Sequence, residues 1–286
     1  MRNRKIRSTF GFTILATLLG SQMLVAARQS SPKLIRDDVY RIIARQVNAQ
    51  TDSPVTDVIG ALDEVIEVGE ITISDKDGKA TVIVKERTPS NIPSLNKSIR
   101  LVLAPAGNNW KWEMFENDRK LYPVEKLFPY VKDEVGRRRQ VTVVRWTAFL
   151  EVMTRQADAA FKLLETAKAI IKSDPAPLAA VTAARAALAK AKQSNDQDAL
   201  RAAFKAVAQA LEPVAALSDQ FQDLKANDAY LRLQDELIGV QKAVPTTRNE
   251  YLHAVAEYND TLQRLPFALV AYGLGFTKIE PPIEAE

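Results

Sequence analysis

The chain has 286 residues, no cysteine and one histidine, and it carries a formal net charge of +4. The absence of cysteine excludes disulfides, thiolate metal sites and cysteine nucleophiles. Four of the 39 basic residues and none of the 35 acidic residues lie in residues 1–27, so the rest of the chain is neutral overall. This distribution argues against a nucleic-acid-binding surface on the folded part.

The N-terminal segment 1–27 combines a basic start with an apolar run from Phe10 to about Ala27. This order is typical of a cleaved secretory signal or of an uncleaved membrane anchor, and the small residues near Ala27 fit a cleavage site. Because basic flanks stay in the cytoplasm, we expect the bulk of the chain on the periplasmic side of a bacterial inner membrane. Residues 1–27 either hold it there or are cleaved and release it into the periplasm.

Residues 33–131 predict a small α+β domain. Apolar residues at helical spacing indicate two helices, the second of which begins at Asp52-Ser53-Pro54 and ends near Gly69. Alternating segments rich in β-branched residues then predict an antiparallel sheet of about four strands, with a hairpin turn at residues 75–79. The expected strands cover residues 70–74, 80–84, 99–103 and 110–115.

The order of two helices followed by a sheet that ends in a Trp-Lys-Trp strand resembles the cystatin and NTF2-like folds. Such folds often hold a pocket between helix and sheet, and the resemblance implies a site for a small apolar or peptide ligand. The polar-tipped aromatic residues that are candidates to line it are Tyr40, Trp110, Trp112 and Tyr122. A place in the core is the simpler interpretation of these side chains.

Residues 121–139 indicate a boundary between two domains. Pro123 and Pro129 favour a short helix or an irregular segment over residues 121–131, and Gly136 with three arginines at residues 137–139 follows. An arginine triplet suits acidic headgroups or phosphate, but a solvated helix start is the simpler interpretation.

From residue 140 to about residue 279 the chain predicts a helical bundle, followed by a tail over residues 280–286. Alanine-rich apolar stripes step by three and four residues, a pattern that lets long helices approach closely. The block from residue 224 to residue 276 predicts two long helices and an irregular end. Within it, Pro245 either kinks one long helix or opens a new one at its first turn.

The motifs of this block resemble the C-terminal signature of the LemA family. They are Leu224-Lys225-Ala226-Asn227, Leu233-Gln234-Asp235-Glu236-Leu237, Arg248, Tyr251, Tyr258-Asn259, Pro266 and Gly275-Phe276. The resemblance covers about residues 140–279, and the chain departs from it at Leu252, where the family usually has asparagine, and in its last residues. It implies an antiparallel bundle of long helices behind an N-terminal membrane helix, and it implies no defined reaction.

Five polar residues inside these motifs are candidates for a structural role, because polar groups inside a bundle must be hydrogen-bonded. We expect a buried network between helices that fixes their register, in preference to a ligand site. Its members are Asn227, Gln234, Asp235, Arg248 and Asn259.

The sequence carries none of the common catalytic patterns. It has no Gly-rich phosphate loop, no His-Glu-x-x-His and no Gly-x-Ser-x-Gly, and His253 is more simply a surface or structural residue. We therefore expect no enzyme, no cofactor and no metal, but a membrane-tethered envelope protein with an interaction or scaffold role. Its partner is then another protein or a second copy of the chain. One alternative is a binding module whose head holds a ligand, and another is a carboxylate-based hydrolase with paired acids in one cleft.

Overall fold

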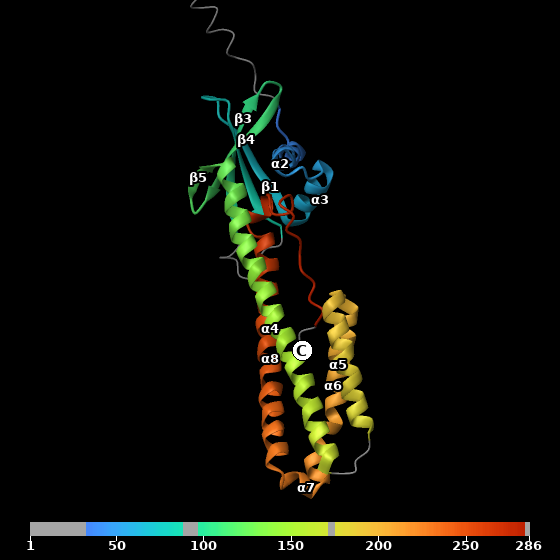
Figure 1. Cartoon of the computed structure of the whole chain (residues 1–286). Helices are drawn as coiled ribbons and strands as arrows, with labels where there is room; N and C mark the ends of the chain where they lie inside the picture. The colour runs from blue at the N-terminus through green and yellow to red at the C-terminus, as the bar shows by residue number, and fades with distance from the viewer. Residues whose placement is uncertain (1–32, 88–96, 171–174, 284–286) are drawn as a thin grey trace, which may run out of the picture.

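A computed structural model describes residues 33–87, 97–170 and 175–283, so the expectations for residues 1–27 lie outside the described residues. The molecule is elongated, with an α+β head at one end, a helical bundle at the other and two long antiparallel helices joining them (Figure 1). In the part of the chain that the structure describes, no helix combines the length and apolar character that a membrane crossing requires.

Two helices, α2 (Arg36–Thr51) and α3 (Val55–Val65), open the head, as the sequence predicts. The carboxylate of Asp38 accepts a hydrogen bond from the backbone N–H of Ile35 at 3.1 Å, which satisfies a free donor at the start of α2. α3 ends at Val65, four residues earlier than expected, because the first strand begins at the next residue.

The sheet is an antiparallel meander in the order β1-β2-β3-β4-β5. Its strands are β1 (Ile66–Ile73), β2 (Ala80–Glu86), β3 (Ser98–Ala106), β4 (Asn109–Asn117) and β5 (Lys120–Pro123). The four expected strands are present, but β5 occupies residues expected to be a short helix or irregular. Asp118 and Arg119 form the turn before it with φ of 48° and 63°, the left-handed conformation that two-residue hairpin turns require.

The helices α2 and α3 pack on one face of the sheet, and that face is the head core (Figure 1). Trp110 and Trp112 both point into it, as their alternation predicts. A register shift opposite Val102 and Leu103 then changes the alternation, so that Phe115 is buried in the core and Met114 is only half-buried.

The two long helices are α4 (Leu127–Ile170), which follows the short helix η2 (Val124–Lys126), and α8 (Asp228–Gln263). α4 runs without a break through the arginine triplet that was expected to mark a domain boundary. Arg137 and Arg138 each bind Glu134, at 2.8 and 3.1 Å, as neighbours on one helix face. α8 likewise continues through Pro245, so the block predicted as two long helices contains one.

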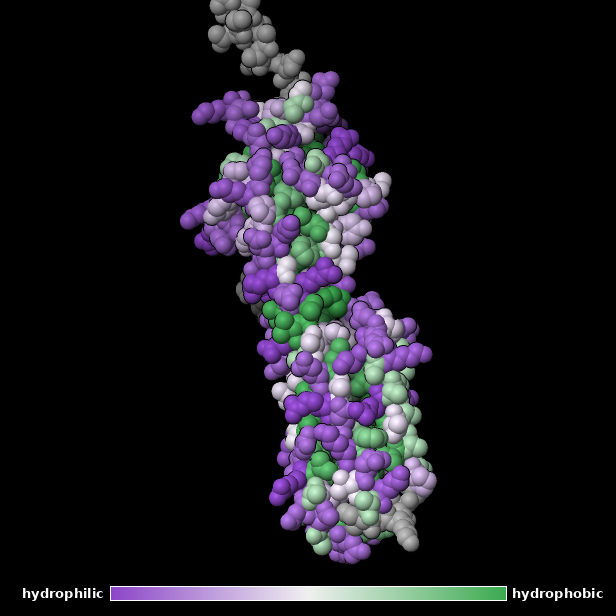
Figure 2. All heavy atoms as spheres, viewed as in Figure 1, coloured by the Kyte–Doolittle hydropathy of each residue, from purple (hydrophilic) through white to green (hydrophobic). Residues whose placement is uncertain are grey.

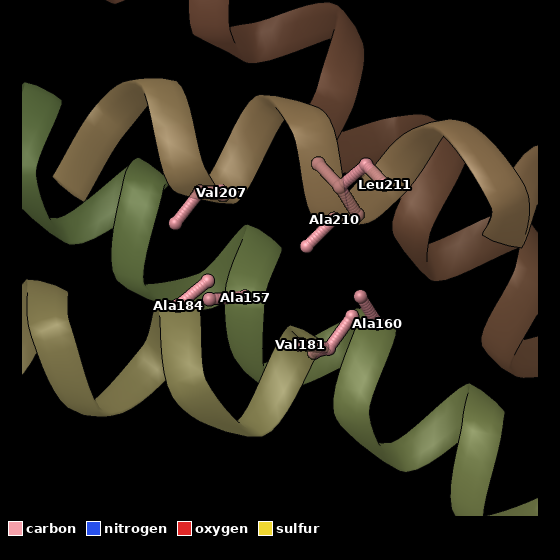
Figure 3. Close-up of a pocket in the computed structure, with 7 residues that line it drawn as sticks. All are labelled: Ala157, Ala160, Val181, Ala184, Val207, Ala210 and Leu211. Carbon is pink, nitrogen blue, oxygen red and sulfur yellow. The ribbon is translucent and has the colours of Figure 1, made fainter. Parts of the chain in front are cut away.

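The helices α5 (Ala176–Ser194), α6 (Gln197–Gln220) and α7 (Gln222–Lys225) complete the bundle with α4 and α8. Small side chains let α4, α5 and α6 approach closely, and the gap between them is too small for a water molecule (Figure 3). The side chains at this contact are Ala157, Ala160, Val181, Ala184, Val207, Ala210 and Leu211.

The head and the bundle have separate hydrophobic cores. Along α4 the head core ends at Val135 and the bundle core begins at Phe149. Between them the molecule narrows to a waist, where Figure 2 shows a hydrophobic patch. At this level α4 exposes Val141, Val143 and Val144.

After α8 the chain enters the head. Leu265, η3 (Phe267–Leu269) and Val270 join the head core, although the sequence pattern predicts them as part of the bundle. The last described residues then run back along the molecule toward the bundle, where Ile283 packs against the bundle core (Figure 1). The C-terminal segment therefore contacts both cores.

Candidate functional site

A groove of about 480 Å³ lies in the head between α3 and the segment that follows α8. Its volume is within the range of ligand-binding clefts. The α3 wall consists of Asp57, Gly60, Ala61, Glu64 and Val65. The opposite wall consists of Leu262, Gln263, Ala268, Ala271, Tyr272, Phe276, Thr277 and Lys278.

Small residues in the middle of both walls keep the groove open. The α3 residues that line it are three and four positions apart, so they share one face of the helix. Gly60 and Ala61 on this face lie opposite a wall that contains Ala268 and Ala271. A Cβ atom added to Gly60 would meet nothing within 4 Å, so the floor at this point is unoccupied by protein.

The α3 wall is acidic. Asp57 and Glu64 are both exposed and stand seven residues apart on the helix, which separates them by about 10.5 Å. The wider region has the same sign of charge, because residues 46–75 contain seven acidic residues and no basic one. Lys278, on the opposite wall, is the one cation among the residues that line the groove.

Two side chains near the end of α8 fix the wall of the groove that lies opposite α3. The amide of Asn259 donates to the carbonyl oxygen of Ile279 at 2.8 Å and accepts from its backbone N–H at 2.9 Å. The hydroxyl of Tyr258 donates to the carbonyl oxygen of Thr277 at 2.9 Å, and burial raises the pKa of this phenol. The extended segment is thus attached to the helix by side chains and not by a sheet.

Gly273 sets how closely the same segment approaches α2. A Cβ atom at this position would lie 2.1 Å from Cγ1 of Val47, a distance that real Cβ contacts do not reach. The Ser53 hydroxyl donates to the Gly273 carbonyl oxygen at 2.9 Å. Only a residue without a side chain fits here.

A buried carboxylate holds the point at which α8 ends. The Glu86 side chain is only 2% exposed, and it accepts from the backbone N–H of Leu265 at 3.0 Å and from Nη1 of Arg264 at 3.2 Å. Hydrogen bonds to Asp260 and then to Glu86 raise the pKa of Arg264. The sequence offered no signal for this contact, because Glu86 looks like an ordinary strand end and Arg264 and Leu265 lie almost 180 residues away.

The four aromatic candidates for a head pocket lie in the head core or against it. The Tyr40 hydroxyl donates to the Ile66 carbonyl oxygen at 3.1 Å, and Nε1 of the fully buried Trp112 donates to the Met114 carbonyl oxygen at 2.8 Å. Trp110 is 8% exposed, and the ring of Tyr122 packs on Phe115. None of the four lines the groove.

The five residues expected to form a polar network between helices all belong to α8 or to its cap, so they do not meet one another. A helix of this length separates Asn227 from Asn259 by about 48 Å. Asn227 instead caps α8, accepting from the Tyr230 N–H at 2.9 Å. Asp235 is exposed, Gln234 and Arg248 are half-buried, and Asn259 holds the C-terminal segment.

Tyr251, another residue of the LemA-like motifs, lies in an aromatic cluster between α4, α6 and α8. Its ring centroid is 4.8 Å from that of Trp146, which also contacts Phe149 and Phe204. Burial raises the pKa of Tyr251 to about 12. By contrast His253 is 74% exposed, which is the surface position that the sequence favoured.

The described residues contain no group of three or more side chains suited to hold a metal ion.

The fold and the groove define an elongated helical-bundle protein with an α+β head. The LemA family model matches residues 145–285, and the C-terminal half of this chain belongs to the LemA family. A comparison with curated proteins finds none that matches.

Proposed function

We propose that the chain is a membrane-tethered envelope protein that acts as a non-enzymatic scaffold and holds its helical bundle at a set distance from the membrane. The observation that carries this proposal is the pair of uninterrupted helices between head and bundle. α4 alone has 44 residues, which correspond to a length of about 66 Å.

The place of the head in the chain supports a molecule that is tethered at its head end. α2, which begins three residues after the start of the described chain, belongs to the head, so the basic and apolar segment 1–27 joins the molecule at that end. A tether there leaves the bundle as the distal part. Glu86 of the head binds the end of α8, and Asn259 of α8 binds the segment that follows it. These two contacts attach α8 to the head, and they favour a spacer that fixes the orientation of the bundle relative to the head.

Cysteine labelling tests the topology, because the native chain has no cysteine to interfere. Full-length chains with Asp118→Cys in the head or Lys205→Cys in the bundle, both exposed sites, are expressed in a bacterium with two membranes. We expect a membrane-impermeant maleimide to label both in intact spheroplasts, and Val131→Cys, which is buried, to stay unlabelled. Labelling that appears only after lysis would contradict the proposal.

A second experiment tests whether the bundle is held at a distance from the membrane. Matched photo-crosslinkers at Lys205 and Asp118 on the membrane-bound protein should give different sets of neighbours, with lipid or membrane proteins captured only from the head. Identical sets from both positions would remove the spacer role. Retention in the membrane after alkaline carbonate washing distinguishes an uncleaved anchor from a cleaved signal.

The alternative function, a binding module in the head, is favoured by one observation. The groove beside α3 is open, mostly apolar and acidic along one wall. This groove lies in a different place from the aromatic residues that the sequence suggested as the lining of a head pocket.

A further inference from the structure

We propose that the groove between α3 and the segment after α8 binds an amphipathic helix of a partner protein, with basic residues on either side of small apolar ones. This inference goes beyond the scaffold role and does not depend on the tether. It makes the head a docking module, whichever compartment the chain occupies.

The shape of the groove favours a helix. Its α3 wall is a helix face in which Gly60 and Ala61 lie between longer residues, and small residues in this position let a second helix approach closely. Ala268 and Ala271 leave similar space on the other wall. A helix that lies along α3 would bury its apolar stripe here, as in other helix-in-groove complexes.

An aromatic side chain is available as an anchor. Tyr272 is 41% exposed although it is one of the large apolar residues of the groove. Aromatic residues at the edge of a docking groove bury a large area at a low cost in conformational entropy. Val65 and Leu262 supply aliphatic surface in the same groove.

The charges specify the partner further. Asp57 and Glu64 are about 10.5 Å apart, and a helix that carries lysine or arginine at positions i and i+7 presents two cations at the same spacing. Between them, the residues at i+3 and i+4 must be small and apolar, because they face Gly60 and Ala61. Lys278 on the far wall disfavours a third cation on that side of the ligand.

The test uses the full-length protein and a capped helical probe peptide with lysines at i and i+7 around alanines at i+3 and i+4. A matched peptide has glutamate in place of both lysines. Fluorescence anisotropy of the labelled peptides should show saturable binding of the lysine peptide and binding of the glutamate peptide that is weaker by about tenfold or more.

Two variants locate the binding. Asp57→Asn combined with Glu64→Gln should weaken the lysine peptide about tenfold, whereas Glu67→Gln, an exposed acid on β1 outside the groove, should change it by less than about twofold. Gly60→Leu should abolish binding by filling the groove. It should keep the fold, because the site is open and leucine favours a helix.

Several outcomes would overturn the proposal. Equal binding of the two peptides would show an apolar surface without charge selection, and equal loss with Glu67→Gln would show general electrostatic attraction. Unchanged binding in a folded Gly60→Leu variant would place the peptide elsewhere. Self-association that Gly60→Leu removes, without any peptide binding, would assign the groove to a second copy of the chain.

Discussion

Asn259 and Ile279 exchange two hydrogen bonds, one at 2.8 Å from the side-chain amide to the backbone carbonyl and one at 2.9 Å from the backbone N–H to the amide oxygen. This pair reproduces with one side chain the pattern that two strands make in an antiparallel ladder. It links the end of α8 to a chain segment that crosses from the head to the bundle. The wall of the groove opposite α3 depends on this pair of hydrogen bonds.

We therefore predict that Asn259→Ala releases the segment after residue 276. The change removes both partners of Ile279, and the expected loss in unfolding free energy is about 1–3 kcal/mol. Hydrogen exchange at residues 277–283 should rise more than exchange in β1. Asn249→Ala, at an exposed position of the same helix, serves as the control, and an equal rise in that variant would contradict the assignment.

Gly273→Ala should destabilise the head, since the new Cβ would overlap with Val47. We expect a loss of about 1–3 kcal/mol by urea unfolding. Gly239→Ala should do the opposite and add about 0.5–1 kcal/mol, because its helical site on α8 is open. If the overlap is the cause, the double change of Val47→Ala and Gly273→Ala costs less than the sum of the single changes.

Two buried tyrosines should respond in opposite directions to the loss of their hydroxyl groups. The Tyr230 hydroxyl is buried in the bundle and has no hydrogen-bond partner among the described residues. Tyr230→Phe should therefore raise the free energy of unfolding by about 1 kcal/mol, and Tyr258→Phe, which loses the bond to Thr277, should lower it by a similar amount. Thermal unfolding of the two variants measures the contrast, and a loss of stability in both would show that Tyr230 is satisfied.

Stability should fall at alkaline pH because of Tyr251. An unfolded tyrosine ionises near its ordinary pKa of 10.0, whereas burial raises the folded pKa of Tyr251 to about 12. Between these values the unfolded state has released a proton that the folded state keeps, so rising pH favours unfolding. The contribution of Tyr251 to the free energy of unfolding is fully present below pH 10 and is lost by pH 12. It amounts to up to about 2–3 kcal/mol.

Urea unfolding at about pH 9 and about pH 11 checks this dependence. Tyr251→Phe should show a smaller decline between the two values than the unchanged chain. Tyr272→Phe, at a 41% exposed site, should leave the decline as it is. The same decline in all three proteins would assign the alkaline sensitivity to other groups.

Local patterns were enough to predict most of the elements. The two head helices, four strands of the sheet and the helical character of the bundle follow from apolar spacing and turn residues. These signals act between residues a few positions apart, so they are readable along the chain. The LemA motifs likewise place the C-terminal half in its family from the sequence alone.

The failures of prediction share a cause. The arginine triplet looked like a domain boundary, but α4 continues through it, with Arg137 and Arg138 paired to Glu134 on the same helix. Of the two alternatives for Pro245, α8 takes that of one long helix. In the same way, the five polar residues of α8 appeared to belong together because their motifs are adjacent in sequence. A rise of 1.5 Å per residue separates them along a rod.

The groove and its walls were decided only by tertiary structure. Glu86 meets Leu265, and Val47 meets Gly273, across more than 170 and 220 residues of chain, and neither contact leaves a pattern in composition or spacing. Helical periodicity showed that α3 has an inner face and an outer face. It could not show that the segment after α8 returns to the head and leaves a gap beside the outer face, because that depends on which distant surfaces bury one another.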